Sequence, residues 1–354
     1  MNGTETIGTL LLAWYDLHRR EMPWRGTGDP YAVWVSETML QQTRVDTVRA
    51  YFPRFMAAFP TVNALAAAEE QAVLKLWEGL GYYRRADHLH RGAKQVAERW
   101  GGRVPDTVEA LLTVSGIGEY TAGAIASIAY GRQVPAVDGN VIRVVTRLTG
   151  NAESLGTAAA MRRVKEQAAA LVPAARPGDF NQAMMDLGAT VCTPGTPDCA
   201  ACPLRAVCRA FAEGDAEGLP NLPGKKPPRP VDYDLLLIYS GARVLMGCRE
   251  EALLQGLWCY PLREGHDTPE ALQRAAEKRM KLRCTLPRLL GEARHVFTHR
   301  VWQMRLWEVR VPENAEAPAG WRFVSGTEMD ALPIPTAVKA ARACAAETLR
   351  KTDA

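Results

Sequence analysis

Four cysteines near the middle of the chain have the spacing of a metal-ligand set. Cys192, Cys199, Cys202 and Cys208 read Cys-x6-Cys-x2-Cys-x5-Cys in a segment rich in proline and glycine. Thiols spaced so closely on one loop favour metal binding over four independent core positions. Thiolates bind zinc and also hold iron–sulfur clusters, and ligand type alone leaves both open.

A helical hairpin is predicted at residues 111–127, LLTVSGIGEYTAGAIAS. Gly116 and Gly118 let the backbone turn between two helices and approach a partner closely. The second helix would present unpaired N–H groups and the positive end of its dipole, for which a phosphate is the natural ligand. In isolation the pattern is also that of an ordinary turn between helices.

Two carboxylates are candidates for acid–base chemistry. Glu37 lies one helical turn from Val33 and Leu40, and a carboxyl held among apolar groups has a raised pKa and serves as a general acid. Asp138 directly precedes a helical run, where aspartate is a favoured N-cap, and a buried cap would hold its carboxylate ionised. The alternatives are an exposed helix-surface glutamate and a purely structural cap.

These candidates lie in a region of helical periodicity that ends near residue 213. A proline-rich linker follows at 219–230, and then the pattern changes to a small α+β domain. Helices are predicted at 6–19, 31–50, 70–77, 85–100, 107–113, 120–129, 140–149, 157–171, 179–190, 268–280 and 336–349, and strands within 231–240, 242–250, 294–311 and 320–325.

The composition is that of an ordinary globular protein. The chain has 354 residues, enough for two domains, with 47% apolar and 23% charged residues. A net charge of +4 permits nucleic-acid binding without requiring it. No stretch approaches the ~18 apolar residues of a membrane span, and the N-terminus reads as an amphipathic helix. We expect a cytoplasmic protein, whose reduced thiols favour metal over disulfides.

The hairpin, the loop after it and Asp138 together resemble the helix-hairpin-helix base-excision DNA glycosylases. A closer resemblance, to the adenine DNA glycosylase (MutY) family, spans most of residues 14–213. Endonuclease III relatives lack the early glutamate and carry a lysine where this chain has Tyr120. The segments that carry the resemblance to the adenine DNA glycosylase family are WVSETMLQQTRVDTV, LWEGLGYYRRADHLH, GIGEYTAGAI, VDGNVIRV and FNQAMMDLGATVC.

The resemblance implies a monofunctional enzyme that removes adenine mispaired with 8-oxoguanine or guanine. Glu37 would protonate adenine N7, and Asp138 would stabilise or transiently trap the oxocarbenium-like sugar, with Tyr120 and Asn140 supporting the site. Tyrosine cannot form the Schiff base that the lysine forms, so no lyase activity is expected.

The resemblance also implies the binding residues and the cofactor. The partner would be double-stranded DNA with an A:8-oxoG or A:G mispair, bound by a monomer with the adenine extruded from the duplex; no membrane partner is expected. The four cysteines would hold a 4Fe-4S cluster. Trp24, Arg25 and Gln182 would line the adenine pocket; Gln42, Thr43, Leu80 and Tyr82 would wedge into the duplex; Gly116 and Gly118 would grip its backbone.

The expected architecture combines a mainly α catalytic region with an α+β, Nudix-like domain that reads 8-oxoguanine. Phe297, Thr298 and His299 match the family's Phe-Ser-His loop, with threonine in place of serine. Residues 265–282 lack the glutamate-rich pattern that holds magnesium, so we expect the fold without hydrolase activity. The predicted divisions are a catalytic region at 1–213 (a six-helix barrel at roughly 30–134 and a cluster domain at 1–29 plus 135–213), a linker at 214–230 and the Nudix-like domain at 231–354.

The same sequence features are compatible with two other functions. One is a thymine or uracil mismatch glycosylase on this scaffold, against which Glu37 and the C-terminal domain argue. The other is a catalytically silent protein that binds DNA lesions, against which the presence of both Glu37 and Asp138 argues.

Overall fold

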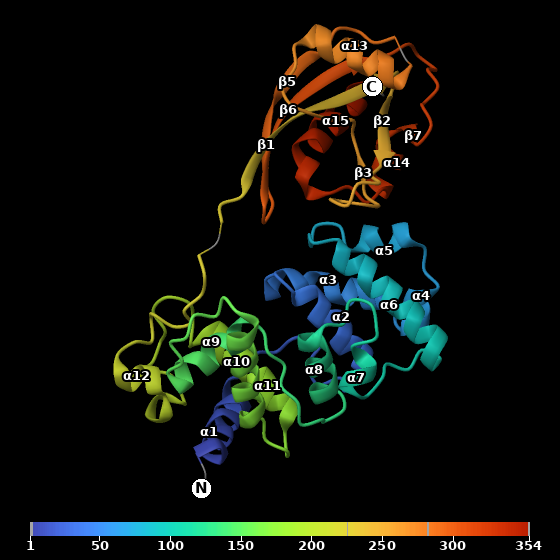
Figure 1. Cartoon of the computed structure of the whole chain (residues 1–354). Coiled ribbons are helices and arrows are strands. Elements are labelled where there is room, and N and C mark those ends of the chain that lie inside the picture. Colours follow the sequence, from blue (N-terminus) through green and yellow to red (C-terminus); the bar gives the residue numbers. More distant parts are fainter. Residues whose placement is uncertain (1–2, 225, 282, 353–354) are drawn as a thin grey trace. The chain divides into compact units, whose positions relative to one another are not determined.

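The computed structural model describes residues 3–224, 226–281 and 283–352 and divides into two compact units (Figure 1). The first comprises Met1–Ala68 and His88–Lys225, and the second comprises Glu69–Asp87 and Lys226–Ala354. The predicted fold class, a mainly α region followed by an α+β domain, is confirmed. The boundaries predicted at 213–214 and 230–231 stay predictions.

The first unit is built from helices. They are α1 (Gly3–His18), α2 (Pro30–Leu40), α3 (Val45–Ala58), α4 (Val62–Ala66), α6 (Arg84–Trp100, whose first residues belong to the second unit), α7 (Val108–Leu111), α8 (Glu119–Ile128), α9 (Gly139–Thr149), α10 (Ala158–Leu171), α11 (Pro177–Thr190), the 3-10 turn η1 (Arg205–Val207) and α12 (Arg209–Glu213).

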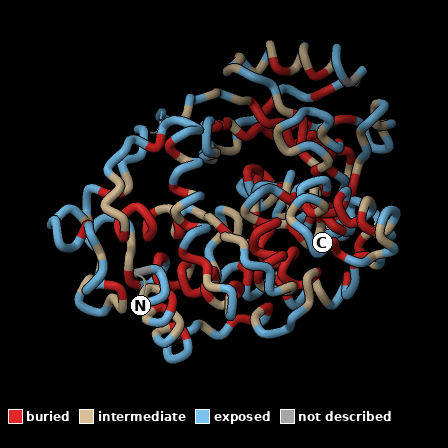
Figure 2. Tube along the Cα trace, turned by 60° about the horizontal axis from the view of Figure 1, so that its bottom comes forward, coloured by how far each residue is buried: buried red, intermediate tan, exposed pale blue. Residues whose placement is uncertain are grey.

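An apolar core joins α1, α9, α10 and α11. Leu11, Val145 and Phe180 are fully or almost fully buried in it. Each such side chain contributes about 1.5–3 kcal/mol through burial. Buried residues run along the inner faces of the elements (Figure 2). This packing fixes α9 and α11, which carry several of the candidate site residues.

The single helix predicted over 31–50 is wrong, because α2 ends at Leu40 and α3 begins at Val45. Between them Gln42 adopts a left-handed conformation with φ of 57°. This conformation is uncommon for a residue other than glycine, and no glycine or proline marks the break in the sequence. The break places Gln42 and Thr43 in a turn instead of on a helix.

The second unit consists of a mixed sheet and helices. Its described elements are α5 (Glu70–Leu76), β1 (Arg229–Ser240), β2 (Arg243–Cys248), β3 (Trp258–Cys259), β4 (Leu262–Glu264), α13 (Pro269–Met280), β5 (Arg288–Val296), β6 (Arg300–Arg310), β7 (Trp321–Val324), α14 (Gly326–Ala331), the 3-10 turn η2 (Thr336–Val338) and α15 (Lys339–Thr352). The strand order is β3-β2-β1-β6-β5, β4 pairs with β1 and β7 pairs with β2; only the β1–β6 pairing is parallel among the described strands.

Helices cover both faces of this sheet (Figure 1). Alternate residues of β1 point to opposite sides, as strand geometry requires. Leu235 and Leu237 pack in the core that contains α15, whereas Leu236 and Ile238 pack in the core that contains α13. In the described residues no helix is long and apolar enough to cross a membrane.

Candidate active site

Helix α2 carries Glu37 into the interior of the first unit. The helix begins at Pro30, directly after Asp29, whose side chain accepts a backbone hydrogen bond of 2.9 Å from the first turn. Proline suits this position because the first N–H of a helix has no intrahelical partner. Residues 31–39 are all buried, and Glu37 is 6% exposed.

Burial raises the pKa of Glu37 to about 7. A hydrogen bond donated by the Tyr120 hydroxyl opposes this increase, the negative charge of Asp138 adds to it, and the positive charge of Arg25 opposes it. A carboxyl with this pKa is substantially protonated at neutral pH and is able to donate a proton. The raised pKa predicted from the sequence is confirmed.

Asp138 is the N-cap of α9, as predicted. One carboxylate oxygen accepts the backbone N–H of Val141 at 2.7 Å, and the other accepts the side-chain amide of Asn140 at 2.8 Å. These bonds favour the ionised form, but burial has the larger effect and raises the pKa of Asp138 above its ordinary value. The cap bonds therefore orient the carboxylate and partly offset its desolvation.

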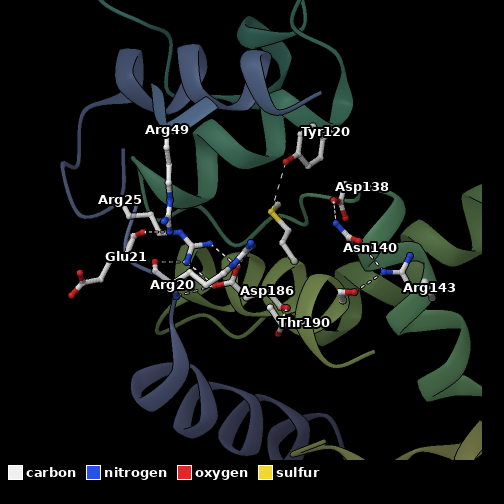
Figure 3. A network of polar contacts seen from close by, with 12 residues as sticks. Arg20, Glu21, Arg25, Arg49, Tyr120, Asp138, Asn140, Arg143, Asp186 and Thr190 are labelled. Atoms are coloured by element: carbon white, nitrogen blue, oxygen red, sulfur yellow. Dashed lines mark hydrogen bonds and ion pairs between the residues drawn. The ribbon is translucent and has the colours of Figure 1, made fainter. Parts of the chain in front are cut away.

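Tyr120 connects the hairpin to Glu37. It lies in α8, and its hydroxyl donates a hydrogen bond to Glu37 Oε2. The same hydroxyl lies 3.7 Å from the sulfur of Met185 (Figure 3). Burial, followed by the charge of Glu37, raises the pKa of Tyr120 well above its usual value, so the hydroxyl stays a neutral donor. The structure thus brings together Glu37, Tyr120, Asp138 and Asn140.

A buried carboxylate holds Arg25 in place. Arg25 Nη1 and Nη2 donate to the two oxygens of Asp186 at 2.6 and 3.0 Å, and Arg20 Nε donates to the same group at 2.8 Å (Figure 3). Asp186 is fully buried. Arg49 also fastens this loop by donating to the backbone oxygen of Glu21 at 2.7 Å. Two guanidinium groups on one carboxylate leave net positive charge near Glu37.

The other two predicted pocket residues differ in environment. Trp24 is buried, and its ring packs edge-on against Phe52 with 5.5 Å between ring centroids. Gln182 lies in α11, one helical turn before Met185 and Asp186. Its side-chain amide donates to the backbone oxygen of Gly178 at 3.4 Å.

A chain of hydrogen bonds runs from Asn140 toward the cysteine loop. Arg143 Nη2 donates to Asn140 Oδ1 at 2.9 Å and to the Gly188 oxygen at 2.6 Å, while Arg143 Nε donates to the Cys192 oxygen at 2.7 Å (Figure 3 labels Asn140 and Arg143). The same helix therefore presents Asp138 and contacts the first cysteine of the predicted ligand set.

The hairpin has the geometry that its two glycines suggest. Gly116 has φ of 81°, and an added Cβ would lie 2.9 Å from the Cβ of His88, so a side chain is excluded there. Gly118 caps α8, and an added Cβ would meet nothing within 4 Å. A cavity of about 490 Å³ adjoins this helix end; it is lined by Gln41, Gly118, Glu119, Tyr120, Thr121, Pro135, Val137 and Lys165.

The predicted wedge residues occupy two turns of the chain. Gln42 is exposed and Thr43 is half-buried in the turn between α2 and α3. In the second unit Tyr82 is 48% exposed and Leu80 is buried. The Tyr82 hydroxyl lies 3.1 Å from Thr298 Oγ1, so the structure joins two of the predicted base-contacting residues.

The loop between β5 and β6 carries the predicted Phe-Thr-His motif. Phe297 packs against Trp302 with 5.0 Å between ring centroids, whereas Thr298 and His299 are exposed. The backbone oxygen of His299 accepts from the N–H of Arg229 at 3.0 Å, which ties the loop to the start of β1. The motif therefore presents two polar side chains on an anchored turn.

The four predicted ligand cysteines are half-buried free thiols. The pKa of Cys202 is raised to about 11, mainly by burial and further by the charges of Cys192, Cys208 and Cys199, which are therefore near enough to act on it. Among the residues that the structure describes, no three His, Cys, Asp or Glu side chains are arranged to hold a metal ion. A cation offsets repulsion between thiolates, so this donor set fits a metal cofactor chemically.

Sequence reasoning missed three residues of this site: Arg20, Met185 and Asp186. The usable signal is helical spacing, because Met185 and Asp186 follow the predicted pocket residue Gln182 at three and four positions and so share its face of α11. The pairing of Asp186 with Arg20 and Arg25 links positions more than 160 apart in the chain, and no local pattern encodes it.

Two family models match the chain. Residues 35–170 match the HhH-GPD superfamily of base excision DNA repair proteins, and residues 235–343 match the NUDIX domain. The first match contains the hairpin and both candidate carboxylates, and the second contains most of the sheet and the Phe-Thr-His loop.

Curated relatives and a solved structure are similar over longer stretches. The chain is 36% identical to human adenine DNA glycosylase over 93% of this chain and 72% of the relative. It is 32% identical to adenine DNA glycosylase of Buchnera aphidicola over 87% of each chain. A thermostable thymine-DNA glycosylase structure is 28% identical with a TM-score of 0.54, covering 59% of this chain and 97% of that one.

Proposed function

The chain belongs to the adenine DNA glycosylase family, and on that premise we propose that it excises adenine mispaired with 8-oxoguanine or guanine by hydrolysing the N-glycosidic bond. The observation that carries the proposal is the buried Glu37 carboxyl, which accepts a hydrogen bond from Tyr120 and has a pKa of about 7 that suits a general acid. The negative charge of Asp138 contributes to this raised pKa, so the two carboxyl groups act on each other in one site. Two carboxylates with different environments are the usual arrangement for cleaving a glycosidic bond.

In the proposed mechanism, Glu37 donates its proton to N7 of the extruded adenine. The electron pair of the C1′–N9 bond then leaves with a neutral base, and positive charge develops on the sugar. The Asp138 carboxylate, oriented by its bonds to Val141 and Asn140, stabilises that charge. Water adds to C1′, and its proton returns the carboxylate of Glu37 to the acid form.

Tyr120 supports hydrolysis over lyase chemistry. A lyase needs an amine that forms a Schiff base with the sugar, and this position of the hairpin carries a phenol hydrogen-bonded to Glu37. We therefore propose a monofunctional enzyme that leaves an abasic site in an unbroken strand. We also propose that Arg25, which Asp186 holds in place, lines the adenine pocket.

The test is a panel of duplexes containing A:8-oxoG, A:G, T:G or U:G, each followed with and without alkali. We expect base release only from the two adenine mispairs and strand breakage only after alkali. Release of thymine or uracil without adenine would support the mismatch-glycosylase alternative that the thymine-DNA glycosylase similarity raises. Binding without any release would support the silent lesion-binding protein.

We propose that Cys192, Cys199, Cys202 and Cys208 hold a 4Fe-4S cluster. When bound, the cluster would serve as a structural crosslink of the loop. Arg147, 2% exposed, already fastens this loop by donating to the backbone oxygens of Thr193 and Gly195 at 2.8 and 3.0 Å.

The purified protein is expected to be coloured and to contain iron and acid-labile sulfide. Cys199→Ser should lose both, because a cluster of this type needs four thiolates. Cys248→Ser, at an exposed cysteine outside the set, is the matched control and should keep both. A colourless wild-type protein with stoichiometric zinc would contradict the assignment.

A further inference from the structure

Residues 69–87 fold with the C-terminal domain, although the chain places them between two segments of the first unit. This segment contains α5 and the turn with Leu80 and Tyr82. The C-terminal domain is therefore attached to the rest of the chain both by the linker near residue 225 and through this inserted segment.

The first attachment is a side-chain amide. Gln71 Nε2 donates to the backbone oxygen of Gly256 at 3.0 Å, and Gln71 Oε1 accepts from the indole N–H of Trp258 at 2.9 Å. Packing is close here, because a Cβ added at Gly256 would lie 3.1 Å from the side chain of Leu74. Both halves of one amide are used, which fixes the orientation of α5 against β3.

The second attachment is a group of charges. Lys75 Nζ donates to the backbone oxygen of Leu332 at 2.9 Å and to Glu78 at 2.5 Å. The other oxygen of Glu78 accepts from Arg342 Nη1 at 2.5 Å, and Arg342 Nη2 binds Asp330 at 3.0 Å. The Glu78 side chain is 18% exposed, so water weakens this ion pair less than a surface pair.

The third attachment is the contact between the Tyr82 hydroxyl and Thr298.

We propose that Gln71, Lys75, Glu78 and Arg342 form a clamp that fixes the 69–87 segment to the C-terminal domain, so that Tyr82 and Thr298 read the base opposite adenine as one surface. The clamp residues are positioning residues. This inference rests on the proposed function, since it assigns a device for selecting 8-oxoguanine.

The clamp variant Gln71→Ala/Glu78→Gln/Arg342→Gln tests the inference in the full chain. The ratio of single-turnover excision rates for A:8-oxoG over A:G should fall roughly tenfold, as a coupling of about 1.4 kcal/mol would produce, while the A:G rate stays at the wild-type value. Hydrogen exchange of residues 70–76 should accelerate, while that of α9 stays unchanged. Arg162→Gln/Glu166→Gln, which removes an exposed ion pair of α10, is the matched control and should change neither quantity.

Two results would overturn the clamp. One is an unchanged rate ratio with unchanged exchange of residues 70–76, and the other is an equal fall of both rates, which would indicate general destabilisation. The exchange measurement does not depend on activity. A wild-type protein that releases no adenine would therefore refute the proposed function separately from the clamp.

Discussion

Glu37→Gln is expected to lower the single-turnover rate of adenine release by about 10³, within the range that a positioned general acid contributes. Glutamine has nearly the same shape and still accepts the hydrogen bond from Tyr120, but it has no acidic proton. The substitution therefore removes the proton donor while preserving the packing of α2. Rates measured with excess enzyme on an A:8-oxoG duplex test this expectation, and a variant as fast as wild type would remove Glu37 from the mechanism.

The pH profile gives an independent test of the same role. The pKa of Glu37 is about 7, so the fraction of protonated acid, and with it the rate, should fall as pH rises through this value. Tyr120→Phe removes a hydrogen bond that lowers this pKa, so the alkaline limb should move to higher pH. An alkaline limb that stays in place in Tyr120→Phe would contradict this coupling.

The substitution Glu37→Gln should raise stability at alkaline pH although it lowers activity. The pKa of Glu37 is about 7 in the folded protein and 4.5 in the unfolded chain, so the folded state binds more protons between these values and loses stability as pH rises through them. Above pH 7 the ionisable carboxyl costs about 3 kcal/mol. Glu37→Gln should therefore unfold at a higher temperature than wild type at pH 8 and show no such advantage near pH 4.

How much of this site the sequence predicts depends on whether the signal is local. The cap at Asp138, the turn at Gly116 and the apolar surroundings of Glu37 each follow from neighbours within about one helical turn, and the structure confirms them. The break at Gln42 carries no glycine or proline, so the helical periodicity of the sequence predicts one continuous helix across it.

Contacts between distant segments are the part that the sequence does not encode in any readable pattern. The Arg25–Asp186 pair and the attachment of residues 69–87 to the C-terminal domain depend on tertiary packing. A charged residue on a helix reads as solvated surface unless its distant partner is known. The role of Asp186 is therefore not predictable from the sequence, although Asp186 is the most completely buried acidic residue near the site.

Asp138→Asn is expected to reduce the rate of adenine release by about 10³, comparable to the loss when one preorganised group is removed from a charged transition state. Unlike Glu37, Asp138 must be ionised to act. Its pKa is raised by burial, so the acid limb of the wild-type profile should lie at higher pH than an ordinary aspartate would give. Together the two carboxylates predict a bell-shaped dependence on pH, with Asp138 controlling the acid side.

The fold should tolerate Asp138→Asn, so this variant distinguishes a chemical role of Asp138 from a structural one. Asparagine is as good an N-cap as aspartate, and its side-chain oxygen still accepts the backbone N–H of Val141. Thermal unfolding of Asp138→Asn should therefore match wild type within a few degrees, whereas Asp138→Ala should lose about 1 kcal/mol of cap stabilisation. If Asp138 acts only as a cap, both variants will retain activity and only Asp138→Ala will be less stable. If its charge stabilises the sugar cation, both variants will lose about 10³ in rate and only the alanine variant will be less stable.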